Sequence, residues 1–261
     1  MGILQRFSLA GRIALVTGGA GSLFGSNLTV ALAEAGATTY IGDIVTDASE
    51  KLAEGLRGEG YDVTALRYDQ GDEASILALR DEILKRSGRC DILVNGAVQR
   101  TMKDRYQSAA STFDTSMKVN ATGLFTITRA FGDEMAKRET GSIINVGSIH
   151  GLIGPDPSIY RGTDMSGWFP DYFFHKGGMI NFTRFIGSYY GPQGVRCNCI
   201  CPGGYNPGAP QPFVRAYSER TFLGRMANET DLMGVLVFLA SEASAYITGA
   251  IIPVDGGYVA R

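Results

Sequence analysis

The chain has 261 residues, of which 44% are hydrophobic and 19% charged, and its formal net charge is −2. This composition is typical of a globular protein and is neither disordered nor membrane-like. Because like charges form no block, nothing favours a nucleic-acid partner or an anionic membrane surface. The first twelve residues lack the apolar core of a signal peptide, and the longest strongly apolar run, residues 235–240, is too short to span a bilayer. We therefore expect a soluble, cytoplasmic protein.

A short apolar run over residues 12–17 predicts a buried parallel strand, and a helical pattern follows over residues 26–35. The loop between them is rich in glycine, which lets a backbone approach a pyrophosphate, while the helix start offers free N–H groups. A lone glycine loop is equally compatible with an ordinary tight turn. If it is a dinucleotide site, its candidate cofactor-binding residues are Gly18, Gly21, Ser22, Leu23, Phe24 and Gly25.

The second predicted strand, residues 38–42, is followed by an acid, Asp43, which lies 18 positions after Gly25. A carboxylate at this place accepts hydrogen bonds from the adenosine ribose hydroxyls and repels a 2′-phosphate. No Arg or Lys lies between Gly25 and Lys51 to bind such a phosphate. The alternative is an exposed acid in a turn. Given the glycine loop, we predict NAD as cofactor in preference to NADP.

Strand and helix patterns then alternate to the end of the chain. The alternation predicts βαβ crossovers and a mostly parallel sheet with helices on both faces. We expect a single doubly wound α/β domain of Rossmann type over residues 1–261, with seven strands. The further strands are expected at residues 63–68, 91–95, 142–146, 195–201 and 250–254, and the further helices at residues 48–56, 73–86, 111–137, 171–190 and 230–239.

Four cysteines are present, and three of them alternate along the strand at residues 195–201. The spacing lacks the C-x2-C pairs that are typical of metal sites. We predict no metal site and interpret the cysteines as small buried residues of a reduced protein, namely Cys90, Cys197, Cys199 and Cys201.

The helix that begins after Pro170 places Tyr172 and Lys176 four residues apart, so both side chains share one face. A phenol beside a fixed ammonium can serve as a general base, because the positive charge favours the phenolate. Taken alone, the pair is also compatible with a chance spacing on an amphipathic helix.

At this point the chain resembles the short-chain dehydrogenase/reductase family over nearly its whole length. The motifs that carry the resemblance are weak singly, but their order and spacing together are specific. They are Thr17-Gly18-Gly19, Asp69, Asn95-Gly96-Ala97, Val119-Asn120-Ala121-Thr122-Gly123, Asn145-Val146-Gly147-Ser148, Tyr172 with Lys176, Pro202-Gly203, Leu223-Gly224-Arg225, Ile247-Thr248-Gly249 and Val254-Asp255-Gly256-Gly257.

The resemblance implies an NAD(P)-dependent enzyme that interconverts a CH–OH group and a carbonyl. It implies that Tyr172 is the general acid/base, and that Lys176 lowers the pKa of Tyr172 and holds the nicotinamide ribose. Ser148 would polarise the reacting oxygen, and Asn120 would hold a water that links Lys176 to solvent. Further cofactor contacts would come from Asp69, Asn95, Ala97, Pro202 and Gly203.

Four departures from the family pattern stand out. The last glycine of the loop, Gly25, comes one residue late, and Gly96 replaces a customary Asn. The segment after Pro202-Gly203 lacks the usual Thr. The gap from Ser148 to Tyr172 is 24 residues, about twice the usual one. Tyr160 is nearer the customary spacing, but Asp164 stands four residues after it, so we assign the base to Tyr172 and interpret residues 154–169 as an inserted substrate loop.

Polar and aromatic side chains in the inserted loop and in a variable lid, residues 204–220, predict a rim for a polyhydroxylated substrate. Solvated loop residues are the alternative for each of them. The candidates for substrate contact are His150, Tyr160, Arg161, Trp168 and Tyr205.

We therefore expect a sugar, sugar acid or polyol as substrate. A 3-oxoacyl thioester reductase is the alternative enzyme, and a non-catalytic dinucleotide-binding regulator is the alternative class. The resemblance also implies a homotetramer, with a dimer as the smaller possibility. Its packing surfaces would be the helices after residues 111 and 170.

Overall fold

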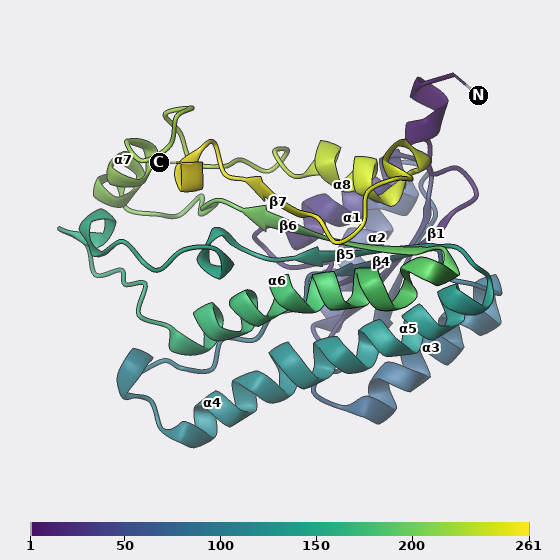
Figure 1. Cartoon of the computed structure of the whole chain (residues 1–261), viewed down its shortest axis with the longest axis horizontal. Coiled ribbons are helices and arrows are strands. Elements are labelled where there is room, and N and C mark those ends of the chain that lie inside the picture. The colour runs from purple at the N-terminus through teal and green to yellow at the C-terminus, as the bar shows by residue number, and fades with distance from the viewer. Residues whose placement is uncertain (1, 261) are drawn as a thin grey trace.

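The computed structural model describes residues 2–260 and contains a seven-stranded sheet in which every strand pair is parallel (Figure 1). The strand order is β3-β2-β1-β4-β5-β6-β7, so the chain reverses its direction of travel between β3 and β4. The predicted α/β fold of Rossmann type is confirmed. The strands are β1 Ile13–Thr17, β2 Thr38–Asp43, β3 Val63–Arg67, β4 Ile92–Asn95, β5 Gly141–Val146, β6 Val195–Pro202 and β7 Ile251–Val254.

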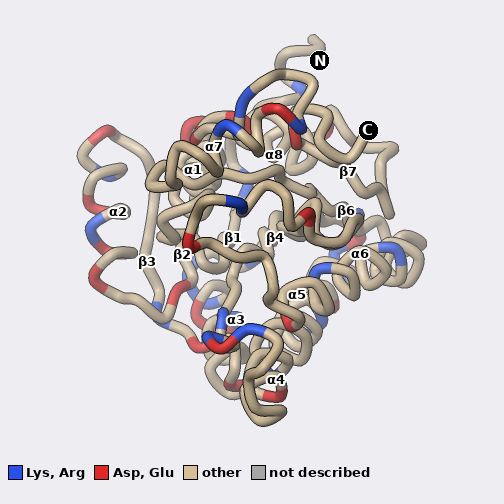
Figure 2. Tube along the Cα trace, turned by 90° about the vertical axis from the view of Figure 1, so that its left-hand side faces the viewer, with Lys and Arg blue, Asp and Glu red and all other residues tan. Residues whose placement is uncertain are grey.

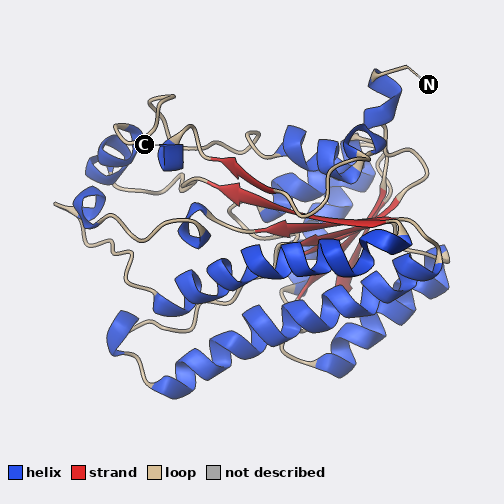
Figure 3. Cartoon of the chain, viewed as in Figure 1, coloured by secondary structure: helices blue, strands red, loops and turns tan. Residues whose placement is uncertain are grey.

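Helices cover both faces of this sheet (Figure 3). On one face α1 and α8 pack over the central strands, and on the other face α3, α5 and α6 do so. The helices are α1 Gly25–Glu34, α2 Thr46–Gly58, α3 Glu73–Ser87, α4 Ala110–Met117, α5 Leu124–Lys137, α6 Pro170–Tyr190, α7 Gln211–Ser218 and α8 Met233–Ala240.

The two-residue period of the strands divides the core between these faces. In β1, Ala14 and Val16 pack against Leu32 of α1, whereas Leu15 belongs to the cluster that contains Phe131 of α5. Because both faces are covered, the strands are apolar at consecutive positions. All four cysteines are free and buried, as predicted.

The helix predicted over residues 111–137 is not uniform. A π-helical segment, Lys118–Gly123, separates α4 from α5. At its end Gly123 lies so close to the backbone of Gln70 that a β carbon would be 2.1 Å from the Gln70 carbonyl oxygen. The lid predicted at residues 204–220 contains a helix, α7, that the sequence pattern did not reveal.

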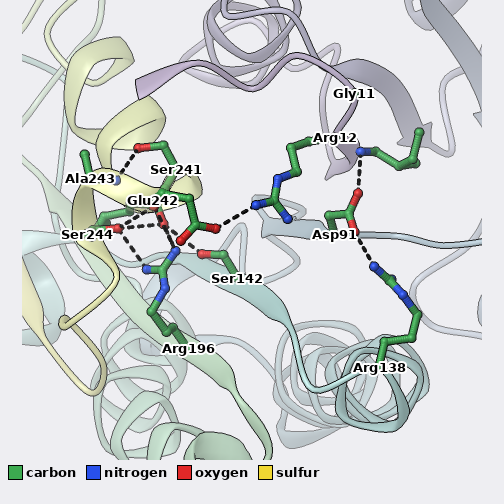
Figure 4. A network of polar contacts seen from close by, with 12 residues as sticks. Gly11, Arg12, Asp91, Arg138, Ser142, Arg196, Ser241, Glu242, Ala243 and Ser244 are labelled. Carbon is green, nitrogen blue, oxygen red and sulfur yellow. Dashed lines mark hydrogen bonds and ion pairs between the residues drawn. The ribbon is translucent and has the colours of Figure 1, made fainter. Parts of the chain in front are cut away.

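Ion pairs close the edge of the sheet where the strands begin (Figure 4). The buried carboxylate of Asp91 accepts hydrogen bonds from Arg138 at 2.6 Å, Arg89 at 3.0 Å and the Ile13 N–H at 2.9 Å. Burial alone would raise the pKa of Asp91, but these donors outweigh it and hold the pKa below its ordinary value. Nearby, Arg12 pairs with Glu242 at 2.6 Å.

Seen from the carboxyl end of the strands, positions of Lys and Arg are interspersed along the chain with positions of Asp and Glu (Figure 2). Among the helices of residues 2–260, none has the length and apolarity that a membrane crossing requires. Within the same residues, no cluster of three His, Cys, Asp or Glu side chains is placed to hold a metal ion.

Candidate active site

A cavity of about 1040 Å³ opens at the carboxyl ends of the strands. Parallel α/β sheets bind their ligands at this edge. The side of the sheet toward which the strand arrowheads point also carries α7 and the inserted loop (Figure 3). Backbone from the glycine loop and from the ends of β2, β4, β5 and β6 lines one part of the cavity, and residues of α6, α7 and the inserted loop line the rest.

The glycine loop contains one extra residue, and it still packs closely against the start of α1. The Ser26 N–H donates to the Gly21 carbonyl at 3.2 Å, a wide turn that encloses the additional position. Gly25 begins α1, and a β carbon there would lie 2.1 Å from the Gly18 carbonyl oxygen. Gly18 has φ +64° and packs against Ala97. Both positions therefore require glycine.

Three backbone N–H groups of this loop are free to bind an anion. Within residues 2–260, no hydrogen bond uses the N–H of Ser22, Leu23 or Phe24. All three residues line the cavity directly before the first turn of α1. Unsatisfied N–H groups at a helix start suit a phosphate. The loop thus fits the pyrophosphate of a dinucleotide.

Two acids lie at the end of the cavity near β2 and β3. The carboxylate of Asp43 accepts from the Val45 N–H at 3.0 Å and from the Ala20 N–H at 3.4 Å, and it joins β2 to the glycine loop. Asp69 accepts from the Gly71 N–H at 2.8 Å. Both line the cavity, so they are placed to meet an adenosine group.

The Thr17 hydroxyl holds the loop after β4, since it accepts hydrogen bonds from the N–H groups of Gly96 at 3.1 Å and Ala97 at 3.2 Å. A β carbon at Gly96 would lie 2.8 Å from the Thr17 carbonyl oxygen, so the glycine fits its close surroundings. Ala97 lines the cavity, but Asn95 does not. The buried side-chain amide of Asn95 donates to Asn145 and Thr128 and connects β4 to β5 and α5.

Tyr172 and Lys176 lie one turn apart on α6, with the Lys176 Nζ 5.7 Å from the centre of the Tyr172 ring. Lys176 is buried and donates to the Val146 carbonyl at 2.5 Å. Burial lowers the pKa of Lys176, and the charge of Tyr172 acts in the opposite sense. Ser148 follows β5 and its Oγ accepts from the His150 N–H at 3.1 Å. The three predicted residues line one end of the cavity.

Asn120 lies in the π-helical segment, behind the cavity wall. Its side chain pairs with the backbone of Gln99 in both directions, at 2.7 and 2.9 Å, and donates to the Ser116 Oγ at 2.9 Å. Ser116 in turn donates to the buried Asp171, the neighbour of Tyr172, at 2.5 Å. The widened turn thus anchors Asn120 to both α4 and α6. Sequence reasoning missed Ser116 and Asp171, because only the packing of α4 on α6 brings them together.

The imidazole rings of His150 and His175 pack edge-on against the ring of Tyr172. The ring centroid of His150 lies 6.3 Å from that of Tyr172, and that of His175 lies 5.3 Å away. Burial, with the charge of Arg100, lowers the pKa of His150 to about 4. Burial, with the charges of Lys176 and Arg100, lowers the pKa of His175 to about 3. Both imidazoles are therefore neutral at pH 7.

Three of the predicted substrate residues line the cavity, namely His150, Tyr160 and Tyr205. Tyr160 packs on Phe213 of α7, with 5.4 Å between the ring centroids. Tyr205 packs on Phe24 of the glycine loop, with 5.0 Å between the ring centroids. The other two, Arg161 and Trp168, are exposed and lie outside the lining. Phe213 and Tyr217 also line the cavity, and their spacing of four residues was the available signal for α7.

Comparison with known proteins identifies the family. Residues 19–259 match the sequence profile described as "Enoyl-(Acyl carrier protein) reductase". A cis-4-hydroxycyclohexanecarboxylate dehydrogenase from Sinomonas cyclohexanicum is 30% identical, with 97% of this chain and 98% of the relative aligned. A 3-oxoacyl-acyl-carrier-protein reductase from Thermotoga maritima is also 30% identical, over 96% of this chain and 99% of that protein.

Among solved structures, a gluconate 5-dehydrogenase from Burkholderia cenocepacia in complex with NADP and tartrate superimposes with a TM-score of 0.88. It is 29% identical, and the match covers 100% of both chains. With its parallel sheet, its glycine loop and its Ser-Tyr-Lys arrangement, the chain belongs to the short-chain dehydrogenase/reductase family of NAD(P)-dependent oxidoreductases that act on CH–OH groups.

Proposed function

We propose that the protein interconverts a secondary alcohol and a ketone of a sugar, sugar acid or polyol, with NAD as cofactor. The observation that carries the proposal is the convergence of Ser148, Tyr172 and Lys176 at one end of the cavity, with a polar and aromatic wall opposite. The free N–H groups of the glycine loop, at residues 22–24, provide the cofactor site.

In this proposal NAD supplies the hydride acceptor, and the chain supplies orientation and a proton path. Tyr172 takes the proton of the substrate hydroxyl during oxidation and returns it during reduction. Lys176, held by the Val146 carbonyl, stabilises the deprotonated phenol by its charge. Ser148 donates a hydrogen bond to the reacting oxygen, and Asn120 holds the water that connects Lys176 to solvent.

The preference for NAD over NADP rests on Asp43 at the end of β2. Its carboxylate lines the cavity next to the glycine loop, where a 2′-phosphate would meet a negative charge. Ile44 and Val45, which follow it, are exposed and apolar, so they offer no cation for a phosphate.

The proposed substrate class rests on the wall formed by the inserted loop, the lid and Arg100. Tyr160, Asp164 and Ser166 contribute polar groups from the inserted loop. Two of the similar proteins are named for the oxidation of hydroxylated carboxylates, a hydroxycyclohexanecarboxylate and gluconate. A wall of this polarity suits a substrate with several hydroxyl groups or an acid group.

Reduction of a 3-oxoacyl thioester is the second candidate. The description of the family profile and the 3-oxoacyl reductase relative favour it. A reductase of this kind would use NADPH, and the carboxylate of Asp43 opposes binding of the 2′-phosphate that NADPH carries. A non-catalytic regulator is the least favoured function, because binding alone does not need a buried lysine beside an active-site tyrosine.

We also propose a homotetramer in the cytoplasm, assembled through α4, α5 and α6. Exposed aromatic side chains gather on α6, where Phe174 is 65%, Phe185 58% and Tyr189 57% exposed, and Phe125 of α5 is 45% exposed. Apolar surface of this kind is typical of protein interfaces. Sedimentation equilibrium of the purified protein tests the assembly, and a monomer at micromolar concentration would contradict it.

The decisive experiment measures the absorbance of reduced nicotinamide with NAD or NADP against sugars, sugar acids, polyols and 3-oxoacyl thioesters. We expect turnover of a hydroxylated compound with NAD. Tyr172→Phe removes the proton acceptor but little volume, so turnover should fall by about 10²- to 10⁴-fold while NAD still binds. Turnover of thioesters alone would establish the second candidate, and unchanged activity of the variant would exclude Tyr172 as the base.

A further inference from the structure

Arg100 follows β4 and extends over the substrate end of the cavity. Its guanidinium carbon lies 5.0 Å from the centre of the Tyr172 ring. The side chain is exposed and belongs to the cavity lining. Across residues 2–260, no carboxylate or carbonyl oxygen pairs with this guanidinium. Its five N–H donors are therefore available to a ligand.

The surroundings of Arg100 hold more positive than negative charge. The ammonium of Lys176 lies 5.7 Å from the centre of the same tyrosine ring. The charge of Arg100 contributes to the lowered pKa values of Lys176, His150 and His175. The acids Asp43 and Asp69 lie at the opposite, adenosine end of the cavity. The inserted loop holds two acids: Asp156 pairs with Arg220 at 3.0 Å, and Asp164 lines the cavity and accepts from Arg105 through its backbone carbonyl at 3.4 Å.

An excess of positive charge at the substrate end of the cavity attracts anionic ligands. The guanidinium is planar and matches a carboxylate with two parallel hydrogen bonds, an arrangement that a neutral hydroxyl cannot reproduce. Because Arg100 lies over the ring of Tyr172, a group bound to it is only a few bonds away from the carbon whose oxygen reaches that tyrosine.

We propose that Arg100 binds a carboxylate of the substrate and thereby selects hydroxy acids, or the corresponding oxo acids, over neutral polyols. This inference deepens the proposed function and rests on it for the position of the reacting carbon. Arg100 then sets specificity, while Ser148, Tyr172 and Lys176 carry out the proton transfer. The imidazole of His150 is neutral, so it adds a hydrogen-bonding group but no positive charge that would compete with Arg100 for the substrate carboxylate.

The test compares matched ligands in the wild type and in Arg100→Gln. The ligands are gluconate, its neutral amide and the neutral alditol, with cis-4-hydroxycyclohexanecarboxylate as an acid that is not a sugar. Arg100→Gln should raise the KM for the acids by about 10- to 100-fold and change kcat much less. The neutral ligands should keep their KM, and Arg100→Lys should recover part of the loss.

Lys103→Gln is the matched control, because Lys103 is an exposed cation of the same loop but lies outside the cavity lining. It should leave all KM values unchanged. Calorimetric titration of gluconate into the protein–NAD complex provides a readout without turnover, and binding should weaken in Arg100→Gln only.

The outcomes separate this proposal from the proposed function. Equal KM changes for acids and neutral ligands, or no preference of the wild type for acids, would overturn the role of Arg100 and leave a polyol dehydrogenase in place. Turnover of the cyclic hydroxy acid but of no sugar compound, with the same dependence on Arg100, would support the carboxylate contact and refute the sugar substrate. Without turnover of any ligand, the calorimetric comparison still decides whether Arg100 binds a carboxylate.

Discussion

Single glycines determine how closely the backbone can approach a cofactor in this protein. Gly25 begins α1 with its Cα against the Gly18 carbonyl, and the extra loop residue is absorbed before it. Replacement of the hydrogen by a methyl group would push the loop away from α1. The three free N–H groups at residues 22–24 would then be displaced relative to α1.

Gly25→Ala should therefore weaken NAD binding by at least about tenfold and also lower stability, since a β carbon 2.1 Å from an oxygen forces the backbone to move. Calorimetric titration with NAD and urea unfolding measure the two effects. The control is Gly55→Ala in α2, where a β carbon meets no atom within 4 Å. It should be neutral or stabilise by about 0.5–1 kcal/mol. Unchanged NAD affinity in Gly25→Ala would refute the assigned role of the loop.

The residues that the sequence located well are those whose position follows from local chain geometry. Asp43 lies at a strand end and Lys176 one helical turn after Tyr172, so neither assignment needed long-range information. Arg161 and Trp168 were expected at the cavity and lie outside it. Their orientation depends on how the inserted loop folds, which no periodicity encodes.

At the level of elements, the π-helical segment Lys118–Gly123 shows what the sequence could not provide. The helical pattern over residues 111–137 is continuous, and the widened turn depends on the contact between Gly123 and Gln70 across the molecule. The same turn orients Asn120 toward Gln99 and Ser116. The helical pattern thus predicted that this segment is helical, but it did not reveal the widened turn on which Asn120 lies.

The edge of the sheet where the strands begin depends on one buried acid. Asp91→Ala should lower the free energy of unfolding by about 1–3 kcal/mol, because the Ile13 N–H loses its acceptor and the half-exposed Arg89 and Arg138 lose their partner. Urea unfolding measures the loss. Asp81→Ala is the control, since Asp81 is exposed and its pair with Arg80 is worth less than about 1 kcal/mol. Similar losses in both variants would show that burial of the Asp91 pairs adds nothing.

At the scale of the whole molecule, mild acid should lower the free energy of unfolding. The effect should begin at a pH at which most carboxylates are still charged. The chain has two histidines, and both are neutral in the folded state, with pKa values lowered to about 4 for His150 and about 3 for His175. In the unfolded chain they take up protons near pH ~6.5. The unfolded state then binds more protons, so stability decreases as the pH falls from about 6.5 toward 4.

His175→Met should remove about half of this dependence, because methionine keeps the apolar volume and cannot be protonated. Urea unfolding at about pH 8 and about pH 5 measures it, and each histidine should account for roughly 2 kcal/mol of the wild-type difference. An equal difference in the variant would mean that His175 does not take up a proton on unfolding.

The substrate wall is connected differently from the cofactor site. The glycine loop and the loop after β4 are joined to the strands by backbone hydrogen bonds and the Thr17 hydroxyl. The inserted loop is joined to other loops by side chains, through the pair of Arg220 with Asp156 at 3.0 Å and the bond of Arg105 to the Asp164 carbonyl.

This difference has a consequence for evolution. Mutations in the inserted loop and in the lid can exchange one substrate for another while Tyr172, Lys176 and the cofactor loop keep their places. Substrate specificity can therefore change independently of the residues that carry out the reaction. We expect substitutions in these two segments to change substrate preference with little effect on hydride transfer.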